Sequence, residues 1–160
     1  MSLVLRTAEP RDAMLVLDLV RELSVYERLS HEVDATSRHF EQALFGPNPR
    51  VFCELAEWDG EAAGFALWFY SFSSFRGRHG IYLEDVFVRP HLRGNGIGTA
   101  LLRGLAQRCA AENLARLEWS VLDWNESALR FYRAIGAVPM EGWTVQRLDG
   151  EALTALGAQP

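Results

Sequence analysis

The chain has 160 residues, a formal net charge of −5, and 49% apolar against 23% charged residues, which predicts one soluble globular domain over residues 1–160. All 16 basic residues are arginines. Without lysine, the chain cannot form a lysine Schiff base, the usual attachment of pyridoxal phosphate, or a Walker A phosphate loop. The acidic balance argues against a nucleic-acid partner, and no apolar run is long enough to span a membrane.

Two observations at the sequence level bear on compartment and metal content. Cys53 and Cys109 lie far apart and in no metal-like spacing, so we expect neither a disulfide framework nor a metal site. The first residues lack the charged and then apolar layout of a signal peptide. We therefore expect a cytoplasmic protein.

The first half of the chain combines alternating and helical apolar patterns. Pro10 suits the first turn of a helix, and the Gly46-Pro47-Asn48-Pro49 run suits the end of another. The Trp58-Asp59-Gly60 run is a turn signal between two apolar stretches. The predicted elements, in order, are a strand over 2–7, a helix from Pro10 through Leu23, a short helix over 35–45, and strands over 51–57 and 63–71.

The second half continues with a polar, glycine-containing loop over 73–80. The predicted elements that follow are a strand over 81–88, a helix over 96–112, a strand over 115–122, a helix over 126–135, a hairpin around 140–143 and a short helix over 149–156. This order predicts an α/β (α+β) fold with a mixed, mostly antiparallel sheet of about seven strands and helices on both faces. It differs from the regular alternation of a dinucleotide-binding fold.

Glycines gather where the helix over 96–112 must begin. Glycine permits positive φ and close approach of the backbone, and a helix start carries about half a positive charge together with unpaired N–H groups. Such a site suits a phosphate, with Arg93 as a neighbouring cation. Gly94 and Gly96 match the first two glycines of the Rossmann fingerprint, but Thr99 stands where the fingerprint has its third glycine. The alternative is a tight turn without a ligand.

The surrounding residues resemble a known family. The run over 81–98 contains "YLEDVFVRP" and "RGNGIG", and the segments over 124–126 and 131–137 read "WNE" and "FYRAIGA". Together they resemble the GNAT superfamily of N-acetyltransferases, and within it the diamine (spermidine/spermine) acetyltransferases and their thialysine-acetylating relatives. The resemblance implies a GNAT fold, acetyl-CoA as co-substrate, and direct transfer of acetyl to a primary amine.

The resemblance also implies roles for two residues. An aliphatic ammonium has a pKa near ~10.4 and must lose a proton before it attacks; Glu84 matches the family's catalytic carboxylate, which takes this proton directly or through water. Tyr132 matches the general acid that protonates the departing thiolate. The alternatives are a structural ion pair for Glu84 and ordinary aromatic packing for Tyr132. Regular alternation places Asp85 on the face opposite Glu84, unless a β-bulge intervenes.

For acetyl-CoA, the resemblance implies a pyrophosphate loop, backbone pairing of the pantetheine with the strand before it, and a contact from Asn125. The alternative for Asn125 is a helix cap. The expected coenzyme-binding residues are Val86, Phe87, Val88, Arg93, Gly94, Asn95, Gly96, Ile97, Gly98, Thr99, Asn125 and Tyr132. With neither cysteine in these motifs, we expect a ternary complex without an acetyl-cysteine intermediate.

The amine is less sharply defined. Glu27 matches an acidic position that holds cationic amines in the polyamine branch, whereas Arg76, Arg78 and His79 occupy the loop before the "YLED" strand. Arginine binds carboxylates in a bidentate manner, which favours a lysine- or thialysine-like amino acid over spermine; the alternative is a solvated loop. The expected substrate-binding residues are Glu27, Arg76, Glu84, Asp85 and Trp124.

Several other functions remain open at this level. They are polyamine or diamine acetylation, acetylation of protein N-termini or lysines, and an acyl-CoA-binding module without turnover. The resemblance further implies a homodimer to which the C-terminal strands contribute.

Overall fold

The computed structural model describes residues 1–160, which fall into two compact units, residues 1–122 and 123–160. The elements of the first unit are β1 (Leu3–Thr7), α1 (Ala13–Tyr26), α2 (Ser37–Phe45), β2 (Phe52–Trp58), β3 (Glu61–Ser73), β4 (Arg78–Val88), α3 (Ile97–Ala111) and β5 (Leu117–Glu118). Short 3₁₀ turns lie at Pro10–Asp12, Ser30–Glu32 and Pro90–Leu92. The second unit holds α4 (Glu126–Ala134) and α5 (Gly150–Gly157).

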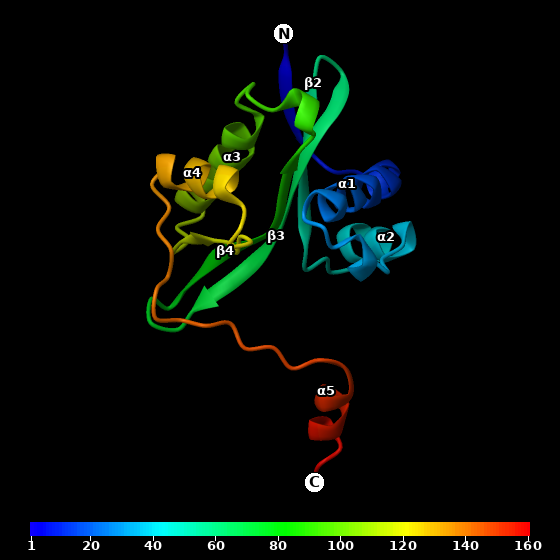
Figure 1. The fold of residues 1–160 in the computed structure, drawn as a ribbon, viewed down its shortest axis with the longest axis vertical. Helices are drawn as coiled ribbons and strands as arrows, with labels where there is room; N and C mark the ends of the chain where they lie inside the picture. Colours follow the sequence, from blue (N-terminus) through cyan, green and yellow to red (C-terminus); the bar gives the residue numbers. More distant parts are fainter. The chain divides into compact units, whose positions relative to one another are not determined.

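The first unit is built on one five-stranded sheet of order β1-β2-β3-β4-β5. Strands β1 to β4 pair antiparallel, and β5 pairs parallel to β4. Helices α1 and α2 cover one face of the sheet and α3 covers the other (Figure 1). This arrangement confirms the predicted α/β class and the mixed, mostly antiparallel sheet with helices on both faces.

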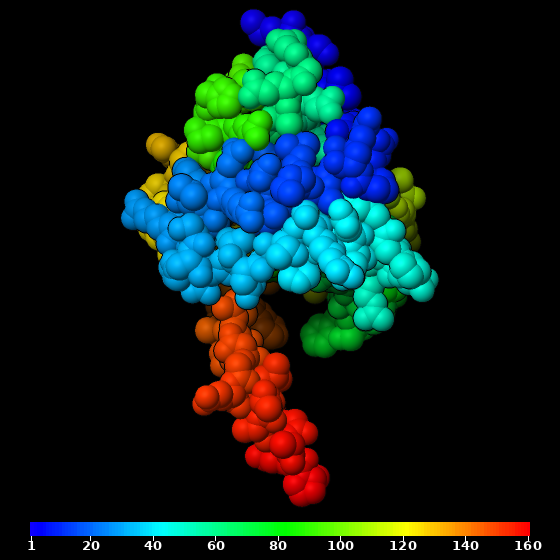
Figure 2. All heavy atoms as spheres, turned by 90° about the vertical axis from the view of Figure 1, so that its right-hand side faces the viewer, coloured from blue at the N-terminus to red at the C-terminus, as the bar shows by residue number.

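The core lies between the sheet and helix α1. Val16, Leu19 and Leu23 of α1 are buried against residues of the central strands such as Phe65 and Phe87. Figure 2 shows the outer side of this layer, where α1 and α2 lie side by side across the middle of the view. On the other face, α3 buries Leu101, Leu102 and Leu105. Burial of this kind contributes about 1.5–3 kcal/mol for each large apolar side chain.

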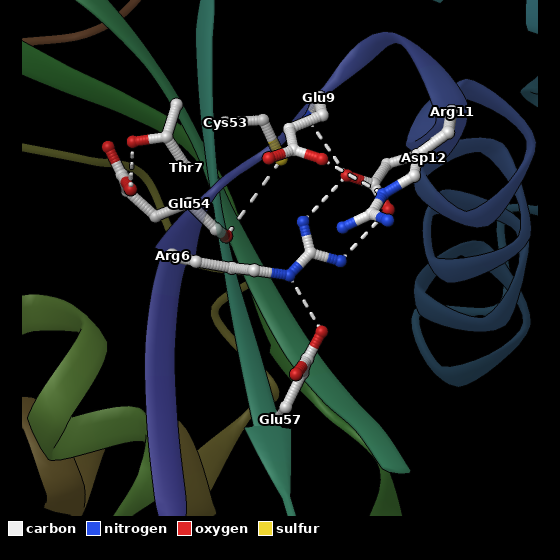
Figure 3. Close-up of polar contacts among 8 residues, drawn as sticks. All are labelled: Arg6, Thr7, Glu9, Arg11, Asp12, Cys53, Glu54 and Glu57. Atoms are coloured by element: carbon white, nitrogen blue, oxygen red, sulfur yellow. Dashed lines mark hydrogen bonds and ion pairs between the residues drawn. The ribbon is translucent and has the colours of Figure 1, made fainter. Parts of the chain in front are cut away.

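An arginine-centred polar network joins β1, β2 and the turn that leads into α1 (Figure 3). The Arg6 guanidinium donates from Nη1 to Asp12 Oδ2 at 2.7 Å, from Nη2 to Asp12 Oδ1 at 2.9 Å, and from Nε to Glu57 Oε1 at 2.7 Å. Asp12 is only 5% exposed, and its Oδ2 also accepts the Glu9 backbone N–H at 2.7 Å. Because Arg6 hydrogen-bonds the carboxylate, the pKa of Asp12 lies below its ordinary value.

The sheet has five strands and not about seven. Of the strand expected over 115–122, only Leu117–Glu118 pairs with a neighbouring strand. The expected hairpin around 140–143 is wrong, because residues 137–149 form neither helix nor strand. The loop over 73–80 is also shorter than expected, since β4 already begins at Arg78. The strand and hairpin expected at 115–122 and around 140–143 therefore exceed the pairing that one copy of the chain provides.

No helix of the chain combines the length and the apolar character that crossing a bilayer requires.

Candidate active site

The loop between β4 and α3 turns on two glycines with left-handed backbone. Gly94 has φ 84° and Gly96, the N-cap of α3, has φ 76°. A Cβ on either would meet no atom within 4 Å, so backbone conformation and not crowding favours glycine here. The N–H groups of Ile97, Gly98 and Thr99 open the helix and have no acceptor within it. The loop therefore presents donors and a positive helix end to an anion, as a pyrophosphate requires.

Two polar side chains of this loop point back onto the protein. Asn95 Nδ2 donates to the Leu92 carbonyl at 3.0 Å. Arg93 Nε donates to the Val88 carbonyl at 2.9 Å, and its guanidinium carbon lies 4.3 Å from the centroid of the Tyr26 ring. The loop thus offers backbone groups outward while these side chains hold its shape.

Strand β4 has a free edge beside this loop. β5 pairs with β4 at Ile81 and Tyr82, and no strand pairs with β4 on that side beyond Tyr82. The Arg89 N–H donates to the Ala63 carbonyl at 2.9 Å, which directs the alternating peptide groups of Val86 and Val88 to the free edge. The carbonyl of Phe87 faces β3 instead, where a Cβ added to Gly64 would clash with it. An extended amide chain such as pantetheine fits along the edge as an added strand.

A β-bulge in β4 carries the predicted catalytic carboxylate. Leu83 pairs with Trp68 and Asp85 with Leu67, which leaves Glu84 as the extra residue. The regular alternation is therefore broken between Leu83 and Asp85. Glu84 is exposed, whereas Asp85 is half-buried beside it. The structure therefore contains the β-bulge that breaks the expected placement of Glu84 and Asp85 on opposite faces of the strand.

Glu27 joins this pair from the end of α1, where it forms the C-cap. Burial, and then the charges of Glu84 and Glu27, raise the pKa of Asp85 to about 7. Burial also raises the pKa of Glu27. None of the three carboxylates has an ion pair or a side-chain hydrogen bond, in contrast to Asp12, Glu22 or Glu112. Glu27, Glu84 and Asp85, here called the acidic trio, are an uncompensated negative site at the negative end of a helix.

Asp85→Asn should stabilise the protein at alkaline pH. A raised carboxyl pKa means that the folded state resists ionisation, so stability declines as pH rises from the ordinary value of 3.8 towards about 7. Allowing for partial exposure, we expect a gain of about 2 kcal/mol at pH 8, or roughly 4–8 °C in the melting temperature, and little change at pH 4. Thermal unfolding at both pH values measures this. An equal effect at the two pH values would contradict the raised pKa.

Three of the predicted site residues belong to the second unit. Asn125 is the N-cap of α4, and its Oδ1 accepts the Ala128 N–H at 3.2 Å. The Tyr132 ring lies on the same helix, with its centroid 5.5 Å from that of Phe131. Trp124 is 44% exposed and comes directly before this helix. Asn125 thus has the capping contact that was the alternative to a coenzyme contact.

The structure does not bring Arg76 to the acidic trio. Arg76 lies in the turn between β3 and β4, and Glu84 follows six residues into β4. At about 3.3 Å per residue, this separates the hairpin turn from Glu84 by roughly 20 Å. Arg78 Nη1 donates to Asn113 Oδ1 at 2.8 Å, at the far end of α3. The hairpin arginines of one copy are therefore remote from its carboxylates.

A hollow near the hairpin turn lies apart from these residues. It has a volume of about 310 Å³ and is lined by Tyr70, His79, Glu112 and Leu114. The charge of Glu112 is already balanced, because Tyr70 donates to it at 2.7 Å and Arg108 at 3.0 Å. No group of three or more histidine, cysteine or acidic side chains is arranged to hold a metal. The glycine loop, the free edge and the acidic trio are the stronger candidate for a site.

Sequence reasoning missed the contribution of Tyr26 and the perturbed state of Asp85. Tyr26 stands next to Glu27, but a tyrosine at the end of an apolar helix gives no signal of a contact with Arg93. The pKa of Asp85 depends on the bulge, which one sequence does not reveal. Two consecutive acids within an apolar strand were the available hint.

Comparison with known proteins bears on this arrangement. Residues 15–137 match the sequence profile of the Acetyltransferase (GNAT) family. The chain is 35% identical to the thialysine N-epsilon-acetyltransferase of Bos taurus over 98% of both chains. It is 28% identical to the L-ornithine N5-acetyltransferase NATA1 of Arabidopsis thaliana, over 95% of this chain and 86% of the relative.

Solved structures share the fold. An integron cassette protein from the mobile metagenome of V. cholerae has a TM-score of 0.82 at 25% identity, over 99% of both chains. An aminoglycoside acetyltransferase from an uncultured soil metagenomic sample has a TM-score of 0.78, covering 93% of this chain and 97% of that one. At 15% identity, the second likeness concerns the fold alone.

Proposed function

This chain belongs to the GNAT family of acetyltransferases, and from that premise we propose that it acetylates the side-chain amine of a thialysine- or lysine-like amino acid. Family membership makes the enzyme an N-acetyltransferase that uses acetyl-CoA and acts on a small-molecule amine. The relatives named for thialysine and ornithine both act on amino acids with a second amine. The finer identity of the substrate is the proposal.

The acidic trio is the observation that carries it. Three neighbouring carboxylates without a cationic partner favour binding of an ammonium, because the cation relieves the repulsion that raises the pKa of Asp85. Two members of the trio, Glu84 and Asp85, lie in β4, whose free edge fits a pantetheine arm and whose next loop fits a pyrophosphate. Amine and thioester can thus meet at one strand.

The proposed chemistry moves two protons from the amine nitrogen: the first goes to Glu84 and is released to solvent, and the second, lost after the attack, replaces the proton that Tyr132 gives to sulfur. When bound, acetyl-CoA supplies the acetyl group as a thioester. Glu84 takes a proton from the ammonium, directly or through a water, so that the amine nitrogen attacks the thioester carbonyl carbon and the carbon–sulfur bond breaks. Asp85 and Glu27 hold the cationic end of the substrate, and Tyr132 gives its hydroxyl proton to the departing sulfur. The net reaction yields an amide, a thiol and one released proton.

Coenzyme binding is proposed for two further sets of residues. Backbone groups of the glycine loop from Gly94 to Thr99 bind the pyrophosphate, and the free edge at the Val86 peptide groups and the Val88 N–H binds the pantetheine amides. Asn125 and Trp124 contribute from the start of α4. We do not include the side chain of Arg76 in the proposed site, because it lies too far from the acidic trio.

Polyamine acetylation is the second candidate. The objection to a polycationic substrate came from the hairpin arginines, and these are remote from the carboxylates of the same copy. The relative named spermidine/spermine N(1)-acetyltransferase-like protein 1 of Homo sapiens is 29% identical over 93% of this chain, which spans 23% of that protein.

Thiol release across an amine panel separates the candidates. The panel comprises thialysine, lysine, ornithine, putrescine, spermidine and an unrelated peptide, each with acetyl-CoA. We expect the highest kcat/KM on thialysine or lysine. The highest value on spermidine would replace the amino-acid proposal with the polyamine one, and the highest on the peptide would replace both.

We further propose that residues 1–160 work as a single N-acetyltransferase domain. The family profile covers 15–137 and so crosses the boundary between the two units at 122/123. A cytoplasmic location follows from the need for acetyl-CoA and agrees with two free cysteines, Cys53 and Cys109.

A homodimer is proposed from the C-terminal segment. Residues 137–149 have no strand partner, and Trp143 and Val145 are 78% and 84% exposed. Exposed apolar side chains in a strand-forming pattern indicate a protein interface. We expect Trp143→Ser/Val145→Ser to elute as a monomer where the parent elutes as a dimer, and Val25→Ser, at a position 67% exposed on α1, to leave the dimer intact. Light scattering after size exclusion measures this, and a monomeric parent would contradict it.

A further inference from the structure

Arg93 contacts three residues of two elements, α1 and β4, with one side chain. Its Nε donates to the Val88 carbonyl at 2.9 Å, at the end of β4. Its guanidinium carbon lies 4.3 Å from the Tyr26 ring centroid and 5.6 Å from that of Phe87. The planar guanidinium therefore stacks against aromatic rings of α1 and β4 and bonds the backbone beside them.

These contacts run from the coenzyme loop towards the amine site. Tyr26 is the last residue of α1, and the next residue is Glu27 of the acidic trio. The rings of Tyr26 and Phe87 have their centroids 6.5 Å apart. Phe87 follows Asp85 by two residues on the bulged strand. The rings that Arg93 contacts are thus close in sequence to two of the three carboxylates, Glu27 and Asp85. Arg93 itself directly precedes the glycine loop.

Two kinds of interaction in this stack depend on guanidinium geometry. The Nε–H bond to Val88 and the close approach to the Tyr26 ring are made by one guanidinium, and a lysine ammonium does not reproduce both contacts together. The bond to Val88 and the ring contacts therefore give Arg93 a structural role that does not depend on a phosphate.

Resting on the proposed function, we propose that Arg93 is a positioning residue that couples the coenzyme loop to the amine site through Tyr26. It fixes the end of α1, and with it Glu27, against β4 and the start of the loop. Amine affinity then depends on Arg93, although the amine does not touch it. Backbone N–H groups, and not the Arg93 charge, hold the pyrophosphate.

Arg93→Gln and Arg93→Lys test the coupling. For each variant we measure KM for thialysine, kcat, and by calorimetry the Kd of CoA and of pantetheine, which lacks the pyrophosphate. Both variants should raise the thialysine KM by about fivefold to twentyfold, with kcat within about threefold, as loss of one stacked cation predicts. The Kd of CoA and of pantetheine should change by the same small factor. Arg103→Gln on the exposed side of α3 is the matched control and should behave as the parent.

A second arm uses the partner ring. Tyr26→Leu should raise the thialysine KM as Arg93→Gln does, and the double variant should cost no more than either single one, because the two residues act as a unit. The milder Arg93→Lys keeps the test valid if Tyr26→Leu folds poorly.

Two outcomes overturn the inference. One is a thialysine KM unchanged in Arg93→Gln. The other is a CoA affinity that falls in Arg93→Gln far more than pantetheine affinity and returns in Arg93→Lys, which identifies a phosphate ligand. The proposed function fails separately, by absence of turnover of any panel amine in the parent enzyme.

Discussion

Glu84→Gln should lower kcat by about 10²- to 10⁴-fold, because the variant keeps the shape of the side chain but cannot accept the proton of the ammonium. Glu84 is exposed on the bulge of β4 and has no ion pair or side-chain hydrogen bond, so its loss should not disturb the fold. The affinity for acetyl-CoA should change little. The deficit should narrow as pH rises towards the amine pKa near ~10.4, where the substrate loses its proton to solvent.

The control for this prediction is Glu41→Gln, an exposed glutamate on α2, which should retain full activity. A kcat for Glu84→Gln within threefold of the parent would remove Glu84 from the mechanism. If Asp85→Asn alone abolished turnover at neutral pH, the proton acceptor would be Asp85, whose pKa of about 7 already suits that task.

Arg6→Met should destabilise the protein by about 3 kcal/mol at neutral pH, or roughly 6–12 °C in melting temperature, because it leaves the buried Asp12 carboxylate without its cation. Methionine retains an aliphatic stem, so the loss is mainly electrostatic. A lowered carboxyl pKa stabilises the folded state above the ordinary value of 3.8 and ceases to do so as pH falls through the folded pKa. The difference between variant and parent should therefore shrink at low pH.

Arg11→Met provides the matched control, since the Arg11–Glu9 pair at 2.9 Å has side chains 73% and 55% exposed. Exposed pairs contribute about 0–1 kcal/mol. Denaturant titrations of both variants measure the two changes. Equal values would mean that the contacts of Arg6 with Asp12 and Glu57 have no special role in holding β1 against the start of α1.

The glycine loop was the part of the site most readable from sequence. Glycines before an apolar run predict left-handed backbone at a helix start, and Gly94 and Gly96 have it. The order of elements likewise predicted the α/β class and the helices on both faces. These features depend on local periodicity and on turn chemistry, which a single sequence records directly.

Other parts depend on pairing between distant residues. The extra residue Glu84 exists only relative to the register of β3, so the bulge and the raised pKa of Asp85 could not be derived. The hairpin expected around 140–143 would need paired strands, and residues 137–149 form none. Arg76 was placed near the substrate because it precedes the catalytic strand. An antiparallel hairpin moves such a residue away by the length of the strand.

The central claim is direct transfer of acetyl from acetyl-CoA to an amine held by the acidic trio. A product balance with thialysine tests it most directly, with free thiol quantified against acetylated thialysine by mass spectrometry in one reaction. The account predicts equal amounts of both, no acetylated protein, and no thiol release without the amine. Thiol release without acetylated thialysine, or an acetylated enzyme that forms in the absence of amine, would contradict it.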